Sequence, residues 1–79
     1  MGKTIFTKAR TIEEQLQFIG ENIRKIRKDK KMTQVELAAK SDLDKQSIFK
    51  IEKGQMNITM KTLFNITDAL EVSSTKILS

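Results

Sequence analysis

The stretch TQVELAAKSDLDKQSIFKI, residues 33–51, decides the fold because it contains two short helical patterns separated by a very short turn. Thr33 and Glu36 have the spacing of a capping box, in which each side chain binds the other's backbone amide, and this predicts a helix over residues 34–40. Two helices joined so closely cross at a steep angle and need a small residue at the crossing, a place that Ala38 can fill. The stretch therefore predicts a helix-turn-helix.

The second helix of this motif has an outward face that is poorly suited to solvent alone. Asp44 can cap it over residues 45–53, and Gly54 can end it. Ile48 and Ile51 share a face and should point into the core. With about 100° per residue, the residues on the opposite face are Gln46, Phe49, Lys50 and Lys53. In a helix-turn-helix the second helix enters the major groove of DNA, so this face is expected to meet the bases.

Helical patterns also run through the rest of the sequence. Apolar residues at helical spacing predict one helix over residues 12–30 and another that ends at Leu70, the first capped by Thr11 and the other by Thr59. Ser73 can cap a final short turn. No run alternates apolar and polar residues in the clear manner of a strand, so we expect an all-α fold of five short helices.

The 79 residues are enough for one small domain. We expect this domain to cover residues 12–79. Residues 1–11 would precede it as a flexible arm that reaches DNA, as an extension that packs on a partner subunit, or as a disordered end. The chain has no proline and only three glycines, so nothing indicates a linker between two domains.

The charge of the chain points to an anionic partner. The net charge is +5, and residues 24–31, RKIRKDKK, hold six basic residues and one acidic residue. Such a cluster indicates nucleic acid or an anionic membrane surface, although a solvated helix face would have the same composition. Membrane binding is disfavoured because the basic segment lacks an aromatic-rich apolar face that could insert.

Several classes of protein are excluded or disfavoured by composition. The chain has neither cysteine nor histidine, which excludes a disulfide framework and the usual zinc sites. It has no glycine-rich phosphate loop and no carboxylate pair placed for catalysis. We therefore expect no enzyme activity, no cofactor and no metal. Together with the helix-turn-helix and the basic charge, the composition leads us to expect a cytoplasmic protein that is bound to DNA.

Three further pieces carry a family resemblance when they are taken together: IRKIRKDKKMTQVELAAKS, SIFKIEKG and NITMKTLFNITDALEV. In these pieces, residues 23–78 resemble the Cro and C-repressor-like (Xre-type) helix-turn-helix family. The resemblance implies a compact, five-helix, lambda-repressor-like domain that binds double-stranded operator DNA, usually as a two-fold dimer. The chain departs from the family at Lys31 and Asp42, where glycine is usual, and at Ile58, where proline is usual. Aspartate tolerates a left-handed backbone better than most residues do.

Polar residues at the start of the second helix are the candidates for reading bases. Gln46 is the best of them because a carboxamide can bind both N6 and N7 of adenine. Phe49 could pack on a thymine methyl group; alternatively, its ring folds back over the domain or lies in a partner interface. The full set of candidate base contacts is Lys45, Gln46, Ser47, Phe49 and Lys50.

Other residues are candidates for holding the phosphate backbone or the fold. Gln34 begins the helix over residues 34–40, where free backbone amides and the side chain can bind a phosphate. The candidate phosphate contacts are Gln34, Lys53, Asn57, Thr59 and Lys61. The resemblance also implies an ion pair between Arg27 and Glu52, which would orient the second helix rather than touch DNA.

A dimer needs a self-complementary patch. The candidates are Phe64, Val72, Ile77 and Leu78, although the core is the simpler place for an apolar residue. We expect a transcriptional regulator that binds a palindromic operator as a homodimer. The alternative is an antitoxin that binds both its operator and a toxin protein, and a restriction–modification controller is a further regulatory variant that the resemblance allows.

Overall fold

The structure is a computed structural model, and it describes residues 11–79. The predicted arm over residues 1–11 lies outside the described residues except for Thr11. Within residues 11–79 the chain forms helices and no strand, which confirms the all-α fold. The five helices are α2 (Ile12–Asp29), α3 (Gln34–Lys40), α4 (Lys45–Glu52), α5 (Met60–Leu70) and α6 (Ser74–Leu78). The predicted helices over residues 12–30 and 45–53 each end one residue earlier than expected.

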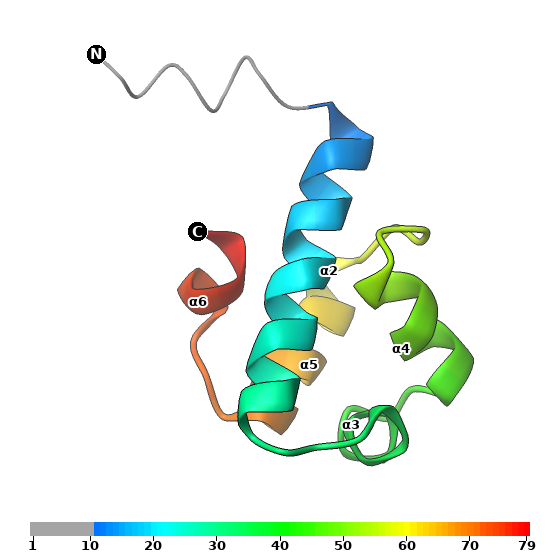
Figure 1. Ribbon diagram of the computed structural model, residues 1–79, viewed down its shortest axis with the longest axis vertical. Helices are drawn as coiled ribbons and strands as arrows, with labels where there is room; N and C mark the ends of the chain where they lie inside the picture. The colour runs from blue at the N-terminus through cyan, green and yellow to red at the C-terminus, as the bar shows by residue number, and fades with distance from the viewer. Residues whose placement is uncertain (1–10) are drawn as a thin grey trace.

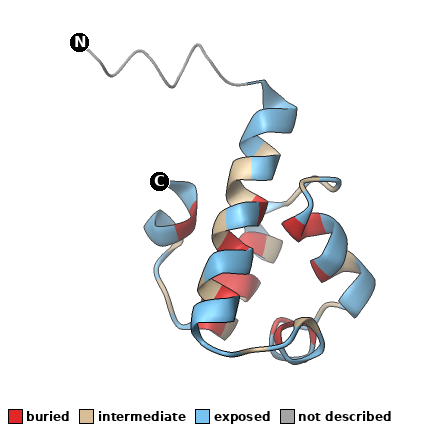
Figure 2. Cartoon of the chain, viewed as in Figure 1, coloured by how far each residue is buried: buried red, intermediate tan, exposed pale blue. Residues whose placement is uncertain are grey.

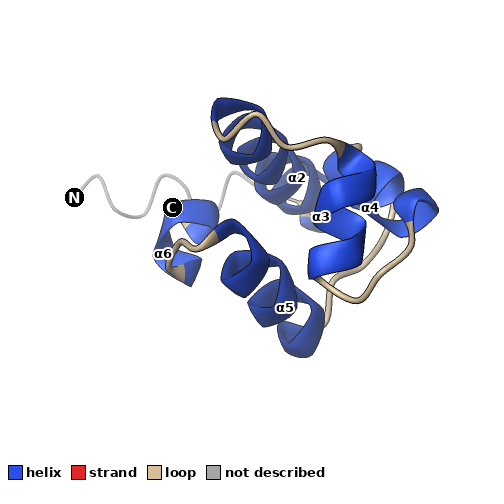
Figure 3. Cartoon of the chain, turned by 90° about the horizontal axis from the view of Figure 1, so that it is seen from below, coloured by secondary structure: helices blue, strands red, loops and turns tan. Residues whose placement is uncertain are grey.

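The helices are arranged around α2, the longest of them. It packs against α4 and α6, while α3 packs against α4 and α5 (Figure 1). Seen from below, α3 and α4 lie on the side of the molecule opposite α6 (Figure 3). The helix-turn-helix and the C-terminal helix therefore form two separate surfaces.

Side-chain caps explain where the helices begin. The predicted capping box of α3 is present: the Thr33 backbone N–H donates to Glu36 Oε1 at 2.8 Å, and the Glu36 N–H donates to Thr33 Oγ1 at 3.0 Å. Thr11 and Glu14 form a second box at the start of α2, where we expected only a simple cap. Each box satisfies two backbone amides that a helix end would otherwise leave without a partner.

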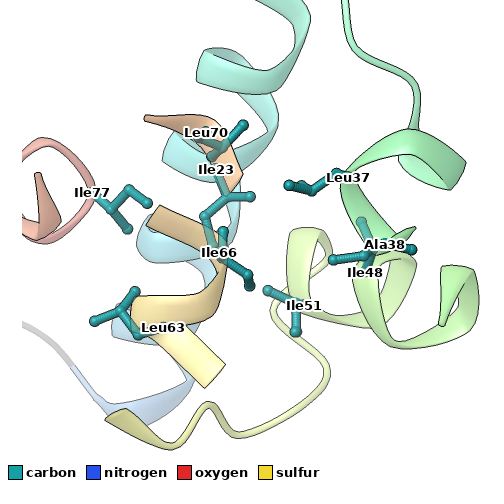
Figure 4. Close-up of a cluster of buried hydrophobic side chains, with 9 residues drawn as sticks. All are labelled: Ile23, Leu37, Ala38, Ile48, Ile51, Leu63, Ile66, Leu70 and Ile77. Atoms are coloured by element: carbon teal, nitrogen blue, oxygen red, sulfur yellow. The ribbon is translucent and has the colours of Figure 1, made fainter. Parts of the chain in front are cut away.

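The core draws on every helix. Nine apolar side chains are buried together, and Figure 4 shows them converging between the helices. They are Ile23, Leu37, Ala38, Ile48, Ile51, Leu63, Ile66, Leu70 and Ile77. Buried positions lie on the inward faces of the helices, whereas the first two turns of α2 extend beyond the core and are largely exposed (Figure 2).

Among residues 11–79, three residues other than glycine adopt a left-handed backbone. Lys31 has φ 57°, Asp42 has φ 60° and Glu71 has φ 60°. Each follows a helix and allows the chain to reverse direction. Because a side chain in this conformation crowds its own backbone, Lys31 and Glu71 each cost about 1–2 kcal/mol that glycine would avoid.

The helix α6 is fixed to α2 by one polar contact and one buried side chain. Asn22 Nδ2 donates a hydrogen bond of 2.7 Å to the carbonyl oxygen of Ile77. The side chain of Ile77 is fully buried. This corrects the expectation that Ile77 belongs to a surface patch for dimerisation, because its side chain is already enclosed within one subunit.

Candidate nucleic-acid interface

The two faces of α4 differ as the sequence predicts. Ile48, Ile51 and Glu52 are buried, and the first two of them join the core. The residues on the other face are exposed: Gln46, Phe49, Lys50 and Lys53. Lys45 is also exposed, whereas Ser47 is half-buried. The helix thus presents an amide, an aromatic ring and several ammonium groups outward.

Phe49 lies partly exposed at the surface. Its side chain is 42% exposed. The Nζ atom of Lys53 lies 5.6 Å from the centre of the ring, which is within range of a cation–π interaction. An open recess of about 570 Å³ between α2 and α4 is lined by both residues and by Arg24.

A buried ion pair joins α4 to α2. Arg27 Nε and Nη2 donate to the two carboxylate oxygens of Glu52 at 2.6 and 3.1 Å. The side chains are only 10% and 2% exposed. A further donor, Arg27 Nη1, binds the Met32 carbonyl at 2.7 Å. Because a guanidinium holds a carboxylate at two points, the pair fixes both the position and the rotation of α4.

Gln34 takes part in the same network. Its side-chain Nε2 donates to Glu52 Oε1 at 3.1 Å, so the amide that was predicted to hold a phosphate is bound to the ion pair. The pair thereby connects α2, α3 and α4. This contact was not expected, since nothing in the spacing of Gln34 and Glu52 distinguishes it from any other pair of polar residues on neighbouring helices.

Gly20 allows α2 and α4 to approach closely. A Cβ atom at Gly20 would lie 2.2 Å from the carbonyl oxygen of Ile51 and 2.8 Å from that of Glu52. This role was also missed, although a glycine inside a helical pattern is a signal for close packing because it costs about 1 kcal/mol relative to alanine. The end of α4 behaves as expected: Gly54 has φ 73° and follows the last helical turn.

The carboxylates that cap α3 and α4 are held in their charged form. The Ser47 backbone N–H donates to Asp44 Oδ1 at 2.7 Å, and hydrogen bonding of this kind lowers the pKa of Asp44. Hydrogen bonds from Thr33 lower the pKa of Glu36 in the same way. Because the pKa values of Asp44 and Glu36 are lowered in the folded state, the caps contribute their full stability when the pH lies above the ordinary pKa of these groups. That contribution is lost as the pH falls through the lowered values.

The candidate phosphate contacts at the start of α5 lie at the surface. Asn57, Thr59 and Lys61 are exposed, as is Lys53 at the end of α4. Thr59 caps α5, and its hydroxyl accepts from the Thr62 backbone N–H at 3.1 Å. Asn57 and Lys61 therefore offer the side-chain donors of this segment.

The candidate dimer residues fall into two groups. Phe64 is 47% exposed and Leu78 is 46% exposed, while Val72 is half-buried. Ile77 is buried, as described above. Phe64, Val72 and Leu78 therefore remain as the candidates for a dimer interface.

The described residues show neither a metal site nor a membrane segment. No cluster of acidic residues among residues 11–79 could hold a metal ion. Over the same part of the chain, every helix is too short or too polar to cross a bilayer.

Comparisons with known proteins agree on one family. A family model described as helix-turn-helix matches residues 23–77. A regulator of Sinorhizobium fredii, the uncharacterized HTH-type transcriptional regulator y4dJ, is 32% identical over 63 residues, which cover 80% of this chain and 82% of that protein. The immunity repressor protein of Bacillus phage phi105 is 37% identical over 54 residues, 68% of this chain and 38% of the repressor.

Solved structures give the same result. The crystal structure of the wild-type restriction-modification controller protein C.Esp1396I superposes with a TM-score of 0.71 at 46% sequence identity. The match covers 73% of this chain and 75% of the controller. The architecture described above is therefore shared with crystallised regulators.

Proposed function

This chain belongs to the helix-turn-helix family of DNA-binding transcriptional regulators, of the Xre and C-repressor type, and on that premise we propose that it binds a palindromic operator as a symmetric dimer. The observation that carries the proposal is the division of α4 into a buried face and an exposed face. The exposed face bears Gln46, Phe49 and Lys50, whose chemistry suits base edges and thymine methyl groups. The protein would regulate by occupying its site, without catalysis.

Each side chain has a role in this proposal. Gln46 reads adenine, Phe49 packs on a thymine methyl group, and Lys45, Ser47 and Lys50 bind guanine or adjacent polar groups. The backbone is held by Lys53, Asn57, Thr59, Lys61 and the start of α3 at Gln34. Phosphate contacts of this kind set the register of the protein on DNA but carry no sequence information.

The first experiment is selection of bound sites from a random duplex library. Recovery of a palindrome, bound on the order of 10³-fold more tightly than random DNA, is the expected result. A non-palindromic site would contradict the dimer, and the absence of any preferred site would contradict sequence-specific binding.

Gln46→Ala tests the reading of bases. We expect it to weaken binding to the selected operator by about 1–3 kcal/mol and to relax the preference at one base pair in each half-site. Fluorescence anisotropy at one fixed salt concentration measures both effects. Lys76→Ala, an exposed substitution on α6, is the control and should leave binding unchanged. Equal loss on all sequences would mean that Gln46 holds the backbone instead.

Phe64→Glu tests the dimer. A carboxylate in the centre of an apolar interface should cost about 2 kcal/mol or more of association free energy. Light scattering is expected to show a dimer for the unchanged protein and a monomer for the variant. Ile12→Glu introduces the same charge at an exposed apolar residue outside the patch and should remain dimeric. If both variants stay dimeric, the interface lies elsewhere.

The similarity to a restriction-modification controller favours a more specific second candidate. Under the proposed mechanism, such a protein would bind DNA upstream of the restriction-modification genes that it controls. A reporter fused to that upstream DNA should then respond to the protein, whereas an unrelated promoter should not.

A further inference from the structure

A second recess lies beside the start of α4, and three separate parts of the chain line it with cations. Lys28 belongs to the last turn of α2, Lys31 to the loop that follows, and Lys45 to the first turn of α4. The recess has a volume of about 490 Å³, and none of the described residues that line it is acidic. Arg27 also reaches it, but the charge of Arg27 is neutralised by Glu52.

The acidic residues near this site in sequence do not form ion pairs with its lysines. Asp29 directly follows Lys28, but it is not among the residues that line the recess. Glu36 binds the backbone N–H of Thr33, and Asp44 binds that of Ser47. The lysine that interacts with the charge of Glu36 is Lys40, and the one that interacts with Asp44 is Lys50; neither lines the recess. Within the described residues, none of the three lysines of the recess forms an ion pair. The recess therefore presents three ammonium groups that form no ion pair with any described residue.

The backbone of Lys31 gives independent support. Its φ of 57° is a left-handed conformation, which glycine adopts without the crowding that a Cβ atom brings. A lysine at this position destabilises the loop, yet it adds a cation to the rim of the recess. Glycine would remove both the crowding and the cation, so this position allows the two effects to be tested together.

We propose that this recess binds one phosphate of the DNA backbone, at the edge of the groove that α4 enters. The inference rests on the proposed function, because it takes α4 as the helix that meets DNA. Lysine ammonium groups bind a phosphate as point charges and tolerate a range of positions, which suits an open recess. Lys28 and Lys31 would supply charge on one side of the phosphate, and Lys45 would connect it to the reading helix.

Lys31→Gly is the most informative variant because it should change stability and binding in opposite directions. Removal of the strained side chain should raise the melting temperature. Loss of the phosphate contact should weaken binding and reduce the slope of log K against log salt by about 1. Lys28→Gln should reduce the slope without a gain in stability. Measurements on a duplex of one fixed sequence suffice, since the contact is to the backbone.

Two controls separate this effect from others. Lys76→Gln removes an exposed lysine on α6 and should leave the salt slope unchanged. Glu71→Gly relieves the same left-handed conformation outside the recess and should raise the melting temperature without lowering the slope. Single methylphosphonate substitutions along the duplex then identify the phosphate: its neutralisation should weaken binding by Lys31→Gly less than binding by the unchanged protein.

The outcomes distinguish the recess from the proposed function. If an operator is found but the Lys28 and Lys31 variants show the same dependence of log K on log salt as Lys76→Gln, the recess does not bind phosphate and the proposed function stands. If no preferred sequence exists but both variants lower the slope, the recess stands and sequence-specific binding fails.

Discussion

Gly20→Ala is expected to destabilise the domain by about 2 kcal/mol or more, although alanine is the better helix former. The added methyl group would lie 2.2 Å from the Ile51 carbonyl oxygen, and because that oxygen belongs to the backbone, it cannot move aside as the end of a flexible side chain could. Relief requires α2 and α4 to separate. The gain in helix propensity is only about 1 kcal/mol, whereas over-packing of a core costs about 1–3 kcal/mol and sometimes more. The steric term is expected to dominate.

Urea denaturation followed by circular dichroism measures this loss. Gln17→Ala, an exposed position on the same helix, is the matched control and should change the midpoint little. The variant should also bind operator more weakly, because α4 would shift away from its supports. An unchanged or higher midpoint for Gly20→Ala would show that α2 and α4 are further apart than in this structure.

Arg27→Met should cost about 3–5 kcal/mol, because it leaves the buried Glu52 carboxylate without its cationic partner. A domain of this size has roughly 4–12 kcal/mol of stability in total, so the variant is expected to lose a large part of its stability and to melt at a clearly lower temperature. The Met32 carbonyl also loses a donor in this variant.

The double variant Arg27→Met/Glu52→Met distinguishes a buried charge from lost packing. Replacing both charged residues by apolar ones of similar size removes the uncompensated carboxylate, and most of the stability should return. It should not return fully, since the Gln34 amide loses its acceptor when Glu52 is replaced. If the double variant is as unstable as the single one, the main contribution of Arg27 is its packing and its bond to Met32. Operator binding by the refolded double variant would then show whether α4 needs the pair for its orientation.

Local features were predictable from the sequence because neighbouring residues determine them. The Thr33 capping box, the left-handed Asp42 and the stop at Gly54 all depend on a few residues and their spacing. The buried face of α4 followed from the helical period alone. The same period could not exclude Ile77 from the surface, because its burial depends on where α6 docks against the other helices.

Contacts between helices were less predictable. A glycine inside a helical pattern is a signal for close packing, but nothing local to Gly20 indicates which element lies against it, because the approach follows from the crossing of two helices that are far apart in sequence. Gln34 illustrates the same limit for the candidate site. Its position at the start of α3 suggested a phosphate ligand, whereas the folded arrangement gives its amide an acceptor on Glu52.

The bond between Asn22 and the Ile77 carbonyl joins residues that are 55 positions apart, and this has a consequence for synthesis in the cell. During translation, α2 leaves the ribosome before α6. The apolar residues that pack on Ile77 therefore stay exposed until α6 has emerged. In that interval the nascent chain presents apolar surface of the kind that chaperones and proteases recognise. A stop codon placed before Ser74 would make this temporary state permanent, and such a chain should be degraded rather than accumulate.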